Sequence, residues 1–354
     1  MYNKDLYLFL TNACPNRCEY CYIKYGHLSM TEADIDKYIE KYNPHRIIFF
    51  GGEPLVRIDL YKYTVKKYWN SGIIFQLVTS TMANWEEFVE FHKEYTIPEL
   101  QISWDGWTDS RIGADGKSIS ETVYGNIINL AYDLRNDGIE RNKNYAFDIK
   151  CVINNHNIKD FKGLHELFKT FKKISGNRIR INGQFVIAHG EDYSEQFYKD
   201  LRRQLYYTFD LDKMYVDHMN KIISYLDQAP GCSCDIGKYI TISPTGMEDC
   251  CTALSQTDYR IDSQLAQERC KSKDCQNCKY SYMCDGGCRY ERWLEFGKDW
   301  PNKHLESTCK IMKIWHEAIE RFLSQCRSDP NRTKLRKLIT HYKQWSHERY
   351  GIEV

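Results

Sequence analysis

The N-terminal part of the sequence contains three cysteines in the spacing C-x3-C-x2-C. They are Cys14, Cys18 and Cys21, within the stretch NACPNRCEYCYI at residues 12–23. Thiolates are soft ligands that suit iron–sulfur clusters and zinc. Three thiolates leave one corner of a cubane cluster without a protein ligand, so that this iron could bind a substrate. A zinc ion that takes a distant fourth ligand is the alternative, and the spacing alone leaves both open.

Most of the other cysteines lie beyond residue 230. They are Cys232, Cys234, Cys250, Cys251, Cys270, Cys275, Cys278, Cys284, Cys288, Cys309 and Cys326. Residues 275–288 have the spacing C-x2-C-x5-C-x3-C. In a reducing compartment, this density indicates a zinc ribbon or further iron–sulfur clusters rather than disulfides. The C-x-x-C pairs do not decide between these two kinds of site.

The overall composition limits the classes of function. A chain of 354 residues accommodates one large catalytic domain with an appendage. Its 49 Lys and Arg nearly balance its 48 Asp and Glu, so the charge favours neither nucleic acid nor a membrane surface as a partner. The N-terminus lacks the apolar run of a signal peptide, and no stretch reaches the roughly 20 apolar residues of a membrane span. We therefore expect a cytoplasmic protein.

The hydrophobic periodicity alternates between strand and helix over the first two thirds of the chain. Six short segments rich in β-branched and aromatic residues predict strands at 5–11, 46–50, 73–80, 99–105, 147–154 and 178–187. Helical repeats lie at 31–42, 58–70, 85–95, 120–136, 160–174 and 194–226. Such alternation predicts a parallel α/β sheet, as an incomplete barrel or a doubly wound sheet. The three N-terminal cysteines follow the first strand, at the end of the sheet where active sites form.

The sequence resembles the radical S-adenosylmethionine (SAM) superfamily in three segments. These are the cysteine triplet, GGEP at residues 51–54, and ISWDGWTDSR at residues 102–111. The resemblance implies an α/β fold with a partial (β/α)6 TIM-like barrel. It also implies that Cys14, Cys18 and Cys21 hold a 4Fe-4S cluster, whose fourth iron is chelated by the amino and carboxylate groups of SAM.

The same resemblance implies which residues contact SAM. They are Tyr20, Gly51, Gly52, Glu53, Pro54, Ser103 and Arg111. Tyr20 is the aromatic residue before the last cysteine, and the glycine turn would contact the SAM amino group, since glycines permit close backbone approach. Ser103 would approach the SAM ribose and Arg111 the SAM carboxylate. Thr79 and Ser80 match the family's third-strand motif only loosely, and we assign them no role.

The cysteine-rich region resembles the SPASM extension of radical SAM enzymes. Eleven residues separate Cys234 from Gly246 and four more separate Gly246 from Cys251, before the later run and a final cysteine. In its full form this extension holds two auxiliary 4Fe-4S clusters. The implied ligands are Cys232, Cys234, Cys251 and Cys288 for the first cluster, and Cys275, Cys278, Cys284 and Cys309 for the second. Cys250 remains an alternative to Cys251, and Cys270 is a spare or alternative ligand.

These patterns divide the chain into three parts. We expect a radical SAM partial barrel at residues 1–228, a SPASM domain with its iron–sulfur clusters at 229–326, and a C-terminal helical tail at 327–354. Two cysteines receive no ligand role, Cys151 inside a strand and Cys326 at a helix end. Buried cysteine commonly behaves as a small hydrophobe, and we expect that here.

The resemblance implies an oxidoreductase that uses SAM and three 4Fe-4S clusters. Reductive cleavage of SAM yields methionine and a 5′-deoxyadenosyl radical, which abstracts a hydrogen atom from an unactivated carbon. Enzymes with the two-cluster extension mostly modify peptides, so we expect maturation of a ribosomally made peptide by a thioether or carbon–carbon crosslink or a related oxidation. The alternatives are an anaerobic sulfatase-maturating, formylglycine-forming enzyme, a small-molecule dehydrogenase, and a zinc-bearing binding module.

The expected partners follow from this chemistry. An external one-electron donor such as flavodoxin or ferredoxin would reduce the first cluster. The first predicted strand begins at Asp5, so recognition of a peptide leader would need a separate protein or another surface. Sulfatase maturases place an acidic residue next to a cluster cysteine, whereas here Asp249 precedes Cys250 and Thr252 follows Cys251. This mismatch disfavours the maturase alternative, and no residue is assigned as the catalytic acid or base.

Overall fold

The computed structural model describes most of the chain. The described residues are 5–108, 110–136, 146–175, 180–187, 192–211, 239–249, 251–253, 255, 270–281, 286–325, 336, 337, 340 and 344. Contacts divide the chain into two compact units, residues 1–189 with 237–260, and residues 190–236 with 261–354. The predicted domain boundaries, after residues 228 and 326, fall outside the described residues.

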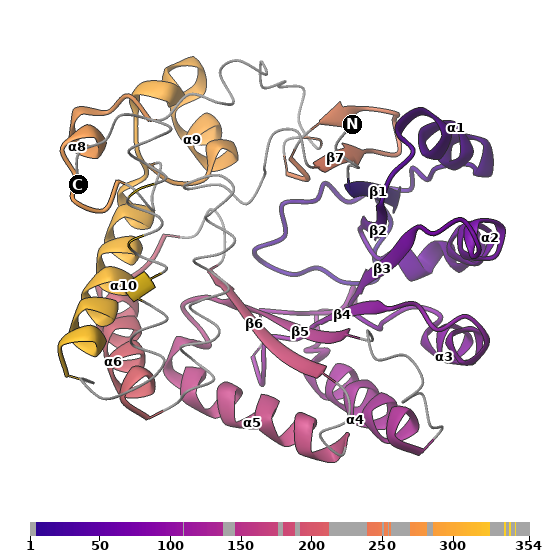
Figure 1. The fold of residues 1–354 in the computed structure, drawn as a ribbon, viewed down its shortest axis with the longest axis horizontal. Helices are drawn as coiled ribbons and strands as arrows, with labels where there is room; N and C mark the ends of the chain where they lie inside the picture. Colours follow the sequence, from indigo (N-terminus) through magenta and orange to yellow (C-terminus); the bar gives the residue numbers. More distant parts are fainter. Residues whose placement is uncertain are drawn as a thin grey trace. The chain divides into compact units, whose positions relative to one another are not determined.

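The first unit contains an open sheet in the order β6-β5-β4-β3-β2-β1-β7-β8 (Figure 1). Its strands are β1 (Asp5–Thr11), β2 (Arg46–Gly51), β3 (Ile74–Thr79), β4 (Glu99–Ser103), β5 (Ala146–Ile153), β6 (Arg180–Ile187), β7 (Tyr239–Ile242) and β8 (Glu248–Asp249). All neighbouring pairs are parallel except β7 with β8. The predicted α/β class with a partial barrel is confirmed. The six predicted strands are present, but the prediction omitted β7 and β8.

Helices connect the parallel strands and lie along one face of the sheet (Figure 1). They are α1 (Glu32–Tyr42), η1 (Pro54–Arg57), α2 (Ile58–Tyr68), α3 (Trp85–Glu94), α4 (Ser120–Asn136), η3 (Ile158–Asp160) and α5 (Phe161–Ile174). A capping box starts α1, in which Thr31 and Asp34 satisfy each other's backbone amides. Because each crossover is a helix that must cover the sheet, this face forms the apolar core.

Alternation along the strands separates the two faces of the sheet. Phe49 on β2 packs edge-on against Tyr61 of α2, and Tyr61 in turn contacts Phe88 of α3. On β5, Ile149 and Cys151 are fully buried, whereas the intervening Lys150 is half-buried. Since successive strand residues point to opposite faces, one set fills the core and the other lines the concave face.

The second unit is helical in its described part. Its elements are α6 (Glu195–Leu211), α8 (Lys273–Gln276), α9 (Arg289–Phe296), η6 (Gly297–Asn302) and α10 (Glu306–Gln325). Ion pairs join α6 to α10, between Arg202 and Glu317 and between Lys310 and Glu195. The predicted helix at 194–226 is described as far as Leu211. None of the helices in the described ranges is long and apolar enough to cross a membrane.

Candidate metal centre and SAM site

Both ends of the loop that carries the N-terminal cysteines are hydrogen-bonded to one residue, Thr11. Thr11 is the last residue of β1, and its hydroxyl accepts hydrogen bonds from the Ala13 amide at 3.0 Å and from Ser29 Oγ at 2.9 Å. The same hydroxyl donates to the Leu28 carbonyl at 3.0 Å. Both ends of the loop are therefore attached to the carboxyl end of the first strand, where the sheet topology places an active site.

The glycines after β2 allow that strand to reach the cysteine loop. The Gly52 amide donates to the Thr11 carbonyl at 2.8 Å, and the Glu53 amide donates to the Ala13 carbonyl at 2.9 Å. A Cβ atom on Gly52 would lie 2.3 Å from the Ala13 oxygen, and Gly51 adopts a φ of +133°. Only glycine fits this backbone contact. The backbone amides of the predicted glycine turn thus hold this turn against the cysteine loop.

A buried glutamate joins the ends of β2 and β3. Glu53 Oε1 accepts from Thr79 Oγ1 at 2.7 Å and from the Leu55 amide, and Glu53 Oε2 accepts from the Ser80 amide at 2.7 Å and the Ser80 hydroxyl at 2.5 Å. Burial raises the pKa of Glu53, and these hydrogen bonds partly offset the increase. Asn16 Nδ2 then donates to Ser80 Oγ at 2.8 Å, which extends the network into the cysteine loop.

Sequence reasoning assigned no role to Thr79 and Ser80, yet both hold Glu53. The available signal was their position at the carboxyl end of the third strand, beside the glycine turn. The residue types did not indicate this role. Their hydroxyls donate to a carboxylate at the end of a different strand, and such a contact leaves no pattern among neighbouring residues. These residues belong to the architecture of the candidate site.

A second buried network joins the cysteine loop to the turn after β4. The Tyr20 hydroxyl donates to Asp105 Oδ2, and Arg111 Nε donates to the same oxygen at 3.2 Å. Arg111 Nη2 lies 2.5 Å from the Tyr20 hydroxyl, and Asp105 Oδ1 accepts from the Val152 amide at 2.8 Å. Burial is the largest single influence and acts to lower the pKa of Arg111, but the charges of Asp105, Tyr20 and Cys18 and the hydrogen bond to Asp105 together raise it above its ordinary range. Arg111 is therefore a fixed cation beside the cysteines.

The three thiols share one electrostatic environment. Burial raises the pKa of Cys14 to about 12, with the Asn16 amide lowering it in part and Glu53, Cys18 and Cys21 raising it further. Burial also raises the pKa values of Cys18 and Cys21, which Arg111 opposes. A bound metal would displace these protons, since thiolate is the ligand form.

The donor set of the cysteine loop fits a metal centre that binds thiolates. The charges of Cys18 and Cys21 act on the pKa of Cys14, so the three thiols lie within electrostatic range of one another. Three thiolates suit a 4Fe-4S cluster with one iron left for another ligand. The assignment of Cys14, Cys18 and Cys21 as its ligands stays a prediction.

The turn that carries Cys251 lies next to the cysteine loop. Its Thr252 hydroxyl and the Tyr22 hydroxyl are 3.0 Å apart, and Asp249 Oδ1 accepts from the Cys251 amide at 3.0 Å. Cys251 itself is buried. Five other cysteines lie outside the described residues, namely Cys232, Cys234, Cys250, Cys284 and Cys326. The ligand set predicted for the first auxiliary cluster stays a prediction.

Four of the ligands predicted for the auxiliary clusters lie in the second unit. Burial raises the pKa of Cys309 on α10, Lys313 lowers it, and Glu306 and Cys278 raise it by smaller amounts. Cys275 lies on α8, and its carbonyl accepts from the Cys278 amide at 3.2 Å. Cys288 is the N-cap residue of α9. The ligand set of the second auxiliary cluster stays a prediction.

The remaining described cysteines have protein partners. The Cys270 thiol is buried and donates to the Lys303 carbonyl at 3.2 Å. A Cβ atom on Gly286 would lie 2.7 Å from its Sγ, so glycine makes room for the thiol. Cys151 is fully buried on the helix-covered face of β5. It behaves as the small hydrophobe expected from the sequence.

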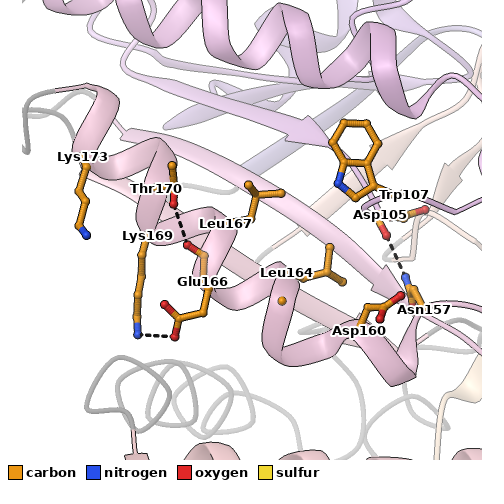
Figure 2. Close-up of a pocket in the computed structure, with 11 residues that line it drawn as sticks. Asp105, Trp107, Asn157, Asp160, Leu164, Glu166, Leu167, Lys169, Thr170 and Lys173 are labelled. Carbon is orange, nitrogen blue, oxygen red and sulfur yellow. Dashed lines mark hydrogen bonds and ion pairs between the residues drawn. The ribbon is translucent and has the colours of Figure 1, made fainter.

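A pocket of about 590 Å³ lies along α5 (Figure 2). Trp107 stands at its edge, and Leu164 and Leu167 of α5 point into it. Gly106, with a φ of +83°, makes room for Leu164, because a Cβ atom there would lie 2.3 Å from Leu164 Cδ2. Asp105 also lines the pocket, but none of the cysteines that the structure describes does. The chemistry predicted from the sequence therefore belongs to the concave rim of the sheet and not to this pocket.

Comparison with known proteins gives one family and a shared fold. Residues 8–168 match the family model described as the radical SAM superfamily. The structure of anSMEcpe with bound AdoMet has a TM-score of 0.61 and 19% identity, covering 92% of this chain and 99% of that one. Streptococcus suis SuiB bound to precursor peptide SuiA has a TM-score of 0.56 and 15% identity, covering 87% and 76%. Native anSMEcpe with AdoMet and the Cp18Cys peptide has a TM-score of 0.61, 17% identity and coverage of 97% and 99%.

Proposed function

Residues 8–168 form a radical SAM domain, and on this premise we propose that the chain is a SAM-dependent oxidoreductase that modifies a peptide. The observation that carries the proposal is the cysteine loop, which is attached to the carboxyl ends of β1, β2 and β4 within the matched segment. A parallel α/β sheet forms its active site at this end.

The residues of the loop have separate tasks in this proposal. Cys14, Cys18 and Cys21 would hold a 4Fe-4S cluster, and SAM on its open iron supplies the one-electron chemistry when bound. The amides of Gly52 and Glu53 fix the start of the loop against β2. Tyr20 and Arg111 fix the middle of the loop against Asp105, and the Arg111 guanidinium lies beside the thiols. Such fixed contacts hold the reacting groups in position before the reaction.

A peptide substrate is supported by the fold comparison. The similar structures include anSMEcpe with a bound peptide and SuiB with its precursor peptide. We propose a ribosomally made peptide that receives a thioether or carbon–carbon crosslink or a related oxidation. Cys251, Cys275, Cys278, Cys288 and Cys309 are offered as ligands of auxiliary clusters, together with the predicted cysteines outside the described residues. Such closed clusters suit electron transfer.

The first experiment tests SAM cleavage. We expect the variant Cys14→Ala/Cys18→Ala/Cys21→Ala to produce no 5′-deoxyadenosine from SAM under anaerobic dithionite reduction, measured by chromatography. Cys151→Ala is the matched control, because this thiol is buried on the opposite face of the sheet. It should retain both cleavage and cluster absorption. Undiminished cleavage in the triple variant would contradict the proposal.

The second experiment tests the substrate. Anaerobic co-expression with short peptides encoded beside the gene, followed by mass spectrometry, should show a loss of two hydrogens at one residue or residue pair. Deuterium uptake from solvent at unchanged mass would indicate epimerisation instead. Formylglycine on a co-expressed sulfatase, with every short peptide unchanged, would replace the peptide proposal by the sulfatase-maturating alternative.

A further inference from the structure

A lysine lies at the rim of the barrel beside the serine predicted to contact SAM. Lys150 is on β5, and its Cα pairs with that of Ser103 on β4. The Trp104 amide donates to the Lys150 carbonyl at 2.9 Å, which extends the pairing of these strands. Ser103 is the last residue of β4, so the pair lies at the carboxyl end of the sheet. This is the end that carries the cysteine loop.

The side chain of Lys150 points to the concave face. Its neighbours Ile149 and Cys151 are fully buried on the face that the helices cover, and Lys150 is half-buried between them. Strand residues alternate between faces, and residues paired across parallel strands share a face. Lys150 and Ser103 therefore face the same concave space, one strand apart.

Within the described part of the chain, no carboxylate forms an ion pair with this lysine. Among the side chains that the structure describes, none forms a hydrogen bond or ion pair with the Lys150 ammonium. Burial lowers the pKa of Lys150, and the charge of Asp148, two residues earlier on the same face, opposes the lowering only in part. A partly desolvated cation without a hydrogen-bonded partner costs free energy, which an anionic ligand would recover.

Lys150 is separate from the cation of the cysteine pocket. The charges that act on Cys18 and Cys21 include Arg111, which Asp105 and Tyr20 already hold. Arg111 reaches the rim of β5 through Asp105, which accepts from the Val152 amide. Arg111 is already paired with Asp105, whereas Lys150, two residues before Val152, has no such partner among the described side chains.

We propose that Lys150 binds a carboxylate of the substrate, an acidic side chain or a chain terminus, and positions it at the mouth of the barrel. The inference rests on the proposed function, since it supposes a substrate that enters this space. A lysine ammonium is a point charge on a flexible stem and accepts a carboxylate in a range of geometries. The other source of a carboxylate is SAM itself, and the experiments separate the two.

The first test uses a carboxylate probe that needs no identified substrate. The purified chain is acetylated with an N-hydroxysuccinimide ester, and the rate at Lys150 is read by peptide mass spectrometry. N-acetyl-L-glutamate α-amide at about 50 mM, a high concentration because one ion pair binds weakly, should slow acetylation of Lys150 measurably. The neutral N-acetyl-L-glutamine α-amide should not. Exposed Lys117 is the internal control and should react equally in both. Equal protection by the two probes would overturn the proposal.

The second test separates SAM from the substrate. In Lys150→Met, the Kd for SAM by calorimetry and the SAM cleavage rate should stay within about twofold of the wild type. The KM for the peptide found by co-expression should rise about tenfold, as expected for the loss of one ion pair, with kcat little changed. Lys150→Arg should restore most of the affinity, and Lys117→Met should change nothing.

A tenfold loss of SAM affinity in Lys150→Met would assign the lysine to the SAM carboxylate and overturn the proposal. An unchanged peptide KM would overturn it too. Failure of the proposed function has a different signature, namely SAM cleavage that survives in the triple cysteine variant. The acetylation result stands independently of that outcome.

Discussion

At the scale of single residues, the candidate site depends on contacts that admit one residue type. Gly52 lies against the backbone of Ala13, where an added methyl group has no space. Glu53 is buried and accepts four hydrogen bonds, three from Thr79 and Ser80 at the end of β3 and one from the Leu55 amide. These residues act through the cysteine loop, since they determine where its backbone lies. Changes at them should therefore be measured both in stability and in cluster binding.

Gly52→Ala should disrupt the cysteine loop. The new Cβ would lie 2.3 Å from the Ala13 oxygen and 2.8 Å from the Ala13 carbonyl carbon, so backbone must move. Overpacking of this kind costs about 1–3 kcal/mol. We expect this loss in the free energy of unfolding of the metal-free chain in urea, with lower absorption near 400 nm after iron and sulfide reconstitution.

The control for this variant is Gly125→Ala. Gly125 lies within α4, and an added Cβ would meet no atom within 4 Å. Alanine is the better helix former by up to about 1 kcal/mol, so this variant should be slightly more stable. Equal stability of the two variants would show that the contact between Gly52 and Ala13 is not a constraint.

At the scale of elements, the helix faces that cover the sheet include a titratable side chain, and its burial favours the neutral form. His92 is on the buried face of α3 and stacks on Phe88, with ring centroids 5.2 Å apart. Burial alone lowers the pKa of His92 to about 4.

Another element, β7, pairs with β1 and so brings the turn of Cys251 beside the cysteine loop. Elements distant in sequence thus complete the site.

His92 should make the stability of the chain depend on pH. Its pKa is lowered in the folded state from an unfolded value near 6.5. Below about pH 6.5 the unfolded chain binds a proton that the folded chain does not, so stability is lost as the pH falls toward 4. The free-energy difference between wild type and His92→Leu should shift by about 2 kcal/mol between pH 7.5 and 5, to the disadvantage of the wild type.

Urea unfolding at several pH values measures this shift. His92→Phe serves as a matched variant, because it keeps an aromatic ring against Phe88. The two variants should differ in absolute stability but follow the same pH dependence. A wild-type curve parallel to both would mean that folding does not lower the pKa of His92.

At the scale of the whole molecule, the cysteines predicted as cluster ligands are distributed over two compact units. Cys14, Cys18, Cys21 and Cys251 belong to the first unit, while Cys275, Cys278, Cys288 and Cys309 belong to the second. The fold is shared with anSMEcpe over nearly the full length of both chains. The cluster content is therefore a property of the complete chain and should be measured on it.

The reconstituted chain should contain about twelve irons, from one open and two closed 4Fe-4S clusters. Anaerobic iron and sulfide assays measure this number. Cys275→Ala/Cys278→Ala should lower it by about four, because a closed cluster needs all its thiolates. Cys270→Ala should leave it unchanged, since this thiol donates to the Lys303 carbonyl. A wild-type value near four would mean that residues 232–309 bind zinc or no metal.

Local sequence patterns were enough to predict the α/β fold class and the radical SAM domain. The spacing of Cys14, Cys18 and Cys21, the glycine turn at residues 51–54 and the alternation of strand and helix periods are all readable from neighbouring residues. They were sufficient for the six main strands and for the radical SAM domain, since side-chain period and glycine conformation are local properties.

Only the tertiary structure decided which distant residues complete the site. The strand β7 has four residues, and its pairing depends on the free edge of β1 rather than on its own pattern. Ser80 supports the cysteine loop through Glu53 and Asn16, and Lys150 meets Ser103 through the register of β4 and β5. Register and burial are settled by packing of the whole sheet, in which a shift of one residue moves every side chain to the opposite face. The spacing of residues along the chain does not contain that information.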